Sequence, residues 1–141
     1  MSGTMDLAHI TPPDGMRESE ISVSWVEPRG FIVTRSKGVK RTVENLAKNA
    51  DMIRDLSGGV PLPVLVFLTD SPLPDKKARE LSARLLPELY SAMAMVSRPG
   101  LAQMVTNIIF RFRKPPIPMR SFKEEHEAVK WLLNYTTKSI P

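Results

Sequence analysis

Apolar and polar residues alternate near the beginning of this chain. From Ile21 to Trp25 every second residue is apolar and the residues between are serines, a period that predicts a half-buried strand. Residues 27–30 have the turn sequence Glu-Pro-Arg-Gly, and residues 31–36 predict a returning strand. Together these segments predict an N-terminal hairpin.

Beyond the hairpin the apolar period changes to the three- and four-residue steps of a helix. Thr42 is placed to cap a helix whose apolar stripe runs to Leu56. Gly58 should end this helix, because glycine readily adopts the left-handed conformation found at helix ends. The mainly apolar residues 64–69 then predict a central strand covered on both faces.

A second helix should begin at Asp75, whose side chain can cap it. We expect Pro87 to end or interrupt this helix, because proline removes a backbone hydrogen bond. Residues 91–96 combine small residues with methionines and predict a further strand.

A third helix is expected between Gly100 and Lys114. Its apolar positions should face the sheet: Leu101, Met104, Val105, Ile108, Ile109 and Phe112. Residues 119–122 predict a last short strand. The final helix opens with Glu124 and Glu125, which suit the positive end of the helix dipole.

The predicted order of elements is ββαβαβαβα, which indicates an α/β fold. Parallel crossovers are right-handed, so we expect a mixed sheet of about five strands with four helices packed on it. A chain of 141 residues suits one domain, which we place at residues 18–138 after a disordered leader at residues 1–17. Whether a pocket lies beneath the third helix stays open at this stage.

The composition excludes several classes of protein. There is no cysteine, hence no disulfide framework and no cysteine-based zinc site. The N-terminal residues lack the basic and apolar regions of a signal peptide. The longest strongly apolar run, residues 64–68, is far shorter than the roughly 20 residues of a membrane-spanning helix. A soluble cytoplasmic protein is therefore expected.

Positive charge is concentrated in one segment. The net charge is +5, and residues 98–120 carry five cations and no acidic residue. On the outer face of the third helix we expect Phe110 to be exposed beside Arg111, Arg113 and Lys114. These four residues are the candidate surface for a protein partner or an anionic lipid headgroup. The alternative is an ordinary solvated helix end, with Phe110 folded over the domain edge.

Few residues here suit catalysis. His9 lies in the predicted leader, and His126 lies among glutamates on the polar side of the last helix. No glycine-rich phosphate loop follows a strand, and no pair of histidines has metal-ligand spacing. We therefore expect no enzymatic activity, no metal site and no cofactor.

Three sequence features together resemble a known family. They are Gly58-Gly59 before a proline-flanked Val-Leu-Val strand, the segment from Asn107 to Pro118, and Phe122 before an acidic helix that contains Trp131. The pattern, which covers roughly Ile21 to Tyr135, resembles an uncharacterised bacterial family of small STAS-like domains. That resemblance implies the anti-sigma-factor-antagonist fold, which is distantly similar to the CRAL-TRIO lipid-transfer fold.

The resemblance also implies a candidate switch loop at Asp70 and Ser71. In regulatory STAS domains, a serine after a central strand is phosphorylated to break partner binding. The loop here departs from the usual Asp-Ser-Ser/Thr-Gly motif, because prolines follow Ser71 and the glycine is missing. An ordinary loop serine is the simpler interpretation.

Two functional hypotheses remain. The first is a non-enzymatic regulatory or protein-interaction module that binds a protein partner near Ser71 or the third helix, and that forms a homodimer through its first strand. The second is a peripheral membrane or lipid-binding domain, or one that binds a small apolar ligand, using the basic-aromatic third helix. Nucleic-acid binding is disfavoured, because the basic segment lacks a recognised reading helix or aromatic residues on a sheet face.

Overall fold

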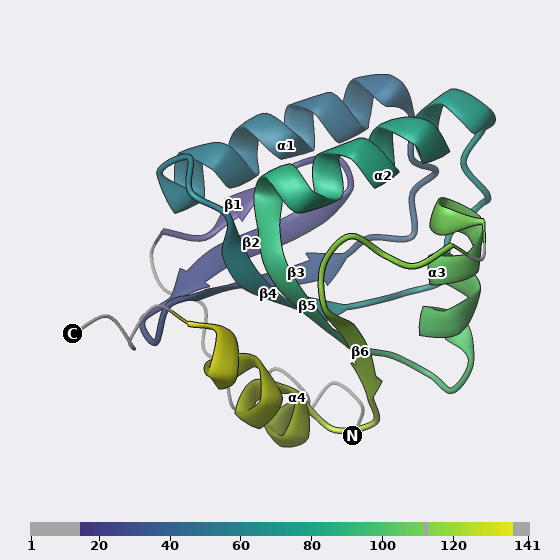
Figure 1. Cartoon of the computed structure of the whole chain (residues 1–141). Coiled ribbons are helices and arrows are strands. Elements are labelled where there is room, and N and C mark those ends of the chain that lie inside the picture. Colours follow the sequence, from purple (N-terminus) through teal and green to yellow (C-terminus); the bar gives the residue numbers. More distant parts are fainter. Residues whose placement is uncertain (1–14, 112, 137–141) are drawn as a thin grey trace.

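One mixed sheet runs through the computed structural model of this chain, which describes residues 15–111 and 113–136 (Figure 1). Within these residues the sheet has six strands, and their order in the sheet follows their order in the chain. The strands are β1 (Arg17–Glu18), β2 (Ser22–Glu27), β3 (Phe31–Ser36), β4 (Leu62–Phe67), β5 (Tyr90–Val96) and β6 (Met119–Phe122). Pairing is antiparallel from β1 to β3 and parallel from β3 to β6.

Helices cover both faces of this sheet, as Figure 1 shows. The elements are α1 (Val43–Ser57), α2 (Lys76–Leu89), α3 (Leu101–Phe110), α4 (Glu125–Leu132) and the short 3-10 helix η2 (Leu133–Tyr135). Because the parallel strands follow one another in one direction, right-handed crossovers place α1, α2 and α3 on the same face. The opposite face is covered by α4.

The strand sequences explain the two layers of core. In β5, Met93 and Met95 point into the cluster formed with α1, α2 and α3, whereas Ala92 and Ala94 point toward α4. Flexible methionines fill the irregular space between the sheet and three helices, while small alanines let α4 approach closely. The four central residues of β4 are buried and contribute to both clusters, as its continuous apolar sequence predicted.

Most predicted helix ends are confirmed. Thr42 caps α1 by accepting a hydrogen bond from the Asn45 backbone N–H, and the Asn45 side-chain oxygen accepts one from the Thr42 backbone N–H. Gly58 ends this helix with φ 73°. Asp75 caps α2 by accepting a 2.9 Å hydrogen bond from the Ala78 backbone. The α/β class, the hairpin and the four helices are as predicted.

Two expectations about boundaries are wrong. Pro87 lies inside α2, because the loss of one hydrogen bond near the helix end is tolerated while Leu86 and Leu89 are buried. The predicted leader overlaps the sheet, since Arg17 belongs to β1. The same short strand pairs with Val23 and Ser24, and so occupies part of the edge of β2 that was expected to pair with a second copy. Residues 1–14 of that leader lie outside the described part of the chain.

Candidate functional site

The expected exposure of Phe110 is wrong. Its side chain is 6% exposed and belongs to the buried cluster between the sheet and α1, α2 and α3. The buried residues of α3 are Leu101, Ala102 and Phe110, whereas Met104, expected in the core, is exposed. The helix is thus rotated by roughly a quarter turn from the predicted orientation. Phe112, the last of the predicted core residues, lies outside the described residues.

The four residues of the predicted surface do not all belong to α3, because the helix ends among them. Arg111 adopts the left-handed conformation with φ 53° and donates its backbone N–H to the Asn107 carbonyl at 2.8 Å. Arg113 and Lys114 therefore lie beyond the helix, and both are exposed. Of the four predicted residues, three cations are at the surface, and Phe110 lies beneath it.

An open apolar groove lies along the outer side of α3. Its two most exposed large apolar side chains are Leu73, 65% exposed, and Met104, 45% exposed. The groove has a volume of about 910 Å³. We call it the α3 groove and define it by its lining residues: Leu73, Arg79, Gly100, Gln103, Met104, Asn107, Ile108 and Arg111.

Leu73 reaches the groove because of the sequence of the β4–α2 loop. The prolines on either side of it keep the chain extended, since a residue before proline avoids the helical region. The loop can enter a helix only after Asp75, which caps α2. Leu73 thus belongs to no helix that could turn its side chain toward the core.

An ion pair joins the two loops that flank the groove. The Arg98 guanidinium donates two hydrogen bonds to the Asp70 carboxylate, at 2.7 and 3.1 Å. These bonds hold the pKa of Asp70 below its usual range. Gly100 then starts α3 in the left-handed conformation, φ 85°, which glycine adopts without strain. The β4–α2 loop and the start of α3, which this ion pair joins, therefore bound the groove.

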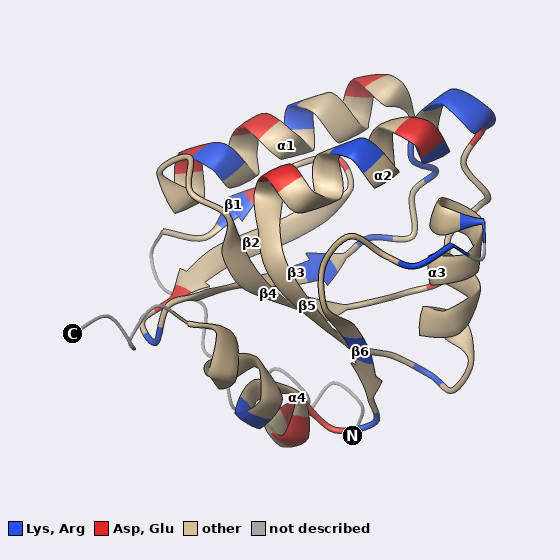
Figure 2. Cartoon of the chain, in the orientation of Figure 1, with Lys and Arg blue, Asp and Glu red and all other residues tan. Residues whose placement is uncertain are grey.

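Within the described part of the chain, the charged residues of the groove are all basic. Arg79 and Arg111 line it, and no described acidic residue does. Neither guanidinium forms an ion pair with a carboxylate of residues 15–111 or 113–136, although Arg79 donates to the Pro74 carbonyl at 3.1 Å. Figure 2 shows basic residues at the beginning of α2 and at the end of α3, two elements that approach each other here. The groove thus offers unpaired positive charge beside exposed apolar surface.

The candidate switch residues lie next to this site. Asp70 is held by Arg98, and Ser71 is exposed two residues before Leu73. Ser71 follows β4, as in the regulatory domains, but α2 begins only at Lys76, so Ser71 does not lie at a helix N-terminus.

Sequence reasoning missed Leu73, Arg79 and Met104 as surface-forming residues. The isolated leucine of Pro72-Leu73-Pro74 was the signal that was available, because an apolar residue held in a proline-rich loop has no periodic element to join. Arg79 and Met104 offered no such signal.

Metal ligands and membrane-spanning helices concern the part of the chain that the structure describes. There, no group of three or more His, Asp or Glu side chains is arranged to hold a metal ion. Nor does any described helix combine the length and apolarity required to cross a membrane.

Known proteins provide a family and a fold. Residues 25–136 match a domain of unknown function, DUF7793. Among solved structures, the chain is similar to an uncharacterised protein of the DUF3478 family with a SpoIIAA-like fold from Shewanella loihica PV-4. The TM-score is 0.53 and the identity 16%, over 84% of this chain and 90% of that chain. No curated protein matches the chain. The predicted STAS-like fold is confirmed, and the similarity at this identity shows the fold alone.

Proposed function

The chain belongs to the DUF7793 family of domains of unknown function, and from the geometry of the α3 groove we propose that it is a non-enzymatic regulatory module that docks a partner protein. The occupant of the groove is an acidic, amphipathic segment of that partner. Its apolar side chains rest on Leu73 and Met104, and its carboxylates pair with Arg79 and Arg111.

One observation carries this proposal. Leu73 and Met104 come from different elements, yet both expose large apolar side chains in the same groove. Apolar surface bordered by polar residues is typical of protein-interaction sites. Burying these two side chains against a partner would favour binding by removing apolar area from water.

The charge of the groove supports an acidic partner over a basic one. Arginine is suited to carboxylates, because its planar guanidinium donates two parallel hydrogen bonds. Arg113 and Lys114 extend the positive surface beyond the end of α3. This surface would speed the encounter with an acidic segment and repel a basic one.

The membrane-binding alternative loses its main argument, because the aromatic residue expected to insert into lipid is buried. We expect the protein to remain unbound in flotation with phosphatidylglycerol vesicles at physiological salt. Flotation that depends on Arg111 and Lys114 would instead support the membrane hypothesis.

A peptide-display selection tests the docking proposal. Immobilised protein is presented with random dodecapeptides, and we expect enrichment of sequences that combine acidic residues with Leu or Phe at helical spacing. The double variant Leu73→Ser, Met104→Ser should bind the selected peptides at least about tenfold more weakly, the usual effect of removing central contacts.

The matched control is the double variant Val43→Ser, Val60→Ser. These side chains are 45% and 54% exposed but lie outside the groove, so peptide affinity should not change. Docking at the α3 groove is excluded if no peptide is enriched, if basic peptides predominate, or if both double variants behave alike.

The regulatory part of the proposal is phosphorylation of Ser71. A phosphate on this exposed serine would add about −1.5 to −2 charge beside a groove that takes acidic segments. We expect Ser71→Asp to weaken binding of the selected peptides and Ser71→Ala to leave it unchanged, measured by fluorescence anisotropy. Equal affinities for the two variants would remove Ser71 from the proposal.

A further inference from the structure

A second, more enclosed space lies on the inner side of α3. It consists of two hollows of about 210 and 170 Å³ between the sheet and the helices of that face. The hollows have an apolar lining in common: Leu46, Val66, Leu68, Leu86, Met93 and Ile109. Because they also share Arg41, we call the two hollows together the Arg41 cavity.

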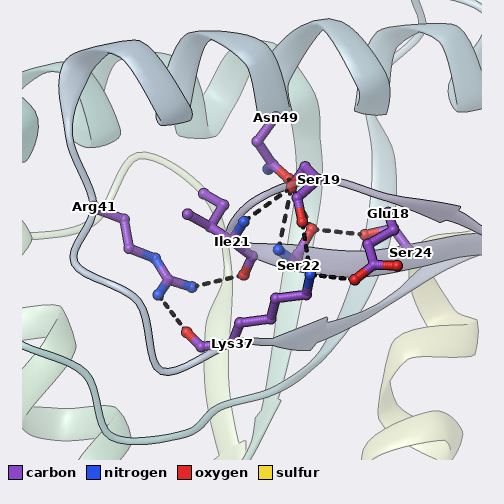
Figure 3. Close-up of polar contacts among 8 residues, drawn as sticks. All are labelled: Glu18, Ser19, Ile21, Ser22, Ser24, Lys37, Arg41 and Asn49. Atoms are coloured by element: carbon purple, nitrogen blue, oxygen red, sulfur yellow. Dashed lines mark hydrogen bonds and ion pairs between the residues drawn. The ribbon is translucent and has the colours of Figure 1, made fainter.

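Among the residues that the structure describes, Arg41 is the one charged residue in the lining of either hollow. It comes from the loop between β3 and α1, and burial lowers the pKa of its guanidinium. Its Nη1 donates to the Lys37 and Val39 carbonyls at 2.6 and 2.7 Å, and its Nη2 donates to Ser36 Oγ at 2.6 Å and to the Ile21 carbonyl at 3.3 Å. Figure 3 shows the contacts to Ile21 and Lys37.

These bonds position the guanidinium but do not neutralise it. All four acceptors are uncharged oxygens, and among the described residues the Nε–H donor has no acceptor. A partly buried cation without a counter-ion is costly, and an anion placed beside it would lower that cost. The cavity therefore combines an apolar interior with one unmatched positive charge.

We infer that the Arg41 cavity binds a small anionic amphiphile, a carboxylate with an unbranched apolar tail. The carboxylate accepts hydrogen bonds from Arg41 Nε and from hydroxyl groups such as those of Thr69 and Ser71, and the tail lies among the shared apolar side chains. This site lies on the inner side of α3 and shares Leu73, Met104 and Ile108 with the α3 groove, but the inference does not depend on the docking proposal.

The single positive charge of Arg41 favours a carboxylate over a phosphate as the ligand's anionic group. One guanidinium balances the single charge of a carboxylate, whereas a phosphate monoester carries about −1.5 to −2 at neutral pH. The excess charge would stay uncompensated beside apolar side chains. The larger hollow holds about seven groups of water size, at roughly 30 Å³ each, so the tail is shorter than that of a membrane lipid.

Calorimetric titration with octanoate, followed by backbone amide NMR shifts, tests this inference. We expect saturable binding, with the largest shifts at Ser82, Met95 and Ile109, which line the cavity. Acetate, octanol and octyl phosphate are the control ligands, and each should bind at least about tenfold more weakly. No saturable binding of octanoate, or octanol binding equally well, would overturn the assignment.

Three variants distinguish loss of the cavity site from loss of the fold. Ser82→Leu should fill the space that both hollows share and abolish octanoate binding, whereas Ala47→Leu, on the exposed side of α1, should leave it intact. Arg41→Gln should weaken octanoate binding and leave octanol binding unchanged. If Arg41→Gln does not fold, Ser82→Leu alone decides, and octanoate that still binds this variant at the wild-type affinity refutes the cavity site.

Discussion

Asp70 and Arg98 connect the two loops that flank the α3 groove, and their pairing can be measured directly. Arg98 lowers the pKa of Asp70 by hydrogen bonding to its carboxylate. A group whose pKa is lower in the folded state contributes stability above its unfolded pKa, which is about 3.9 for aspartate. That contribution is lost as the pH falls through the folded-state value.

The variant Arg98→Gln should therefore raise the pKa of Asp70 toward its ordinary value. Carboxyl carbon shifts followed by NMR between neutral and acidic pH provide the measurement. Arg113→Gln, which removes a cation beyond the end of α3, is the control and should leave the titration of Asp70 unchanged. An unchanged titration in Arg98→Gln would show that the pair does not form in solution.

The burial of Phe110 leads to a prediction about stability. Phe110→Ala should lower the free energy of unfolding by about 3–5 kcal/mol, the usual cost of removing a buried aromatic ring. Arg113→Ala, at an exposed position, should change it by less than about 0.5 kcal/mol. Urea unfolding compares the two. Equal free energies of unfolding in the two variants would indicate that Phe110 is exposed, as the sequence suggested.

Single elements show how local chemistry and packing share the control of structure. The boundaries of α1 could be predicted from the sequence. Thr42 caps its start and Gly58 ends it in the left-handed conformation, and both effects involve only residues close by in the chain. Its neighbour α2 continues through Pro87, where packing of the last turn outweighs the missing hydrogen bond. Helix starts are thus easier to predict than helix ends that packing stabilises.

The end of α3 provides a prediction at this scale. Arg111 holds the left-handed conformation, which costs a non-glycine residue about 1–2 kcal/mol. Arg111→Gly should stabilise the domain by up to about 1 kcal/mol in thermal unfolding, yet weaken binding of the acidic peptides selected on the α3 groove. A destabilised variant would contradict the strain argument, and unchanged peptide affinity would remove Arg111 from the docking site.

At the scale of the whole molecule, α3 separates the proposed docking groove from the proposed ligand cavity. Leu73, Met104 and Ile108 line both spaces. A ligand in the Arg41 cavity would hold these side chains outward, where they add apolar surface to the groove. The two sites should therefore be energetically coupled.

This coupling is measurable if both sites exist. Saturating octanoate should tighten binding of a selected acidic peptide by about fivefold or more, and the peptide should tighten octanoate binding by the same factor, because coupling free energies are reciprocal. Ser82→Leu should remove the dependence on octanoate. Independent binding would show that α3 does not transmit occupancy between its two sides.

The sequence by itself determined the α/β class, the hairpin, the helix starts and the concentration of basic residues around the third helix. These features depend on residues within a turn or a strand of one another, such as Thr42 with Asn45 or the buried run of β4. Local hydrogen bonds, backbone preferences and the apolar period need no distant partner, so they can be predicted from neighbours in the chain.

Only the tertiary structure decided which side of α3 is buried. Apolar residues occur on most sides of this helix, so its sequence is compatible with more than one orientation, and packing against α2 and the sheet selects the one that buries Phe110 and exposes Met104. The α3 groove and the Arg41 cavity follow from that choice. Both unite residues distant in the chain, and contacts between such residues exist only once the sheet has brought their elements together.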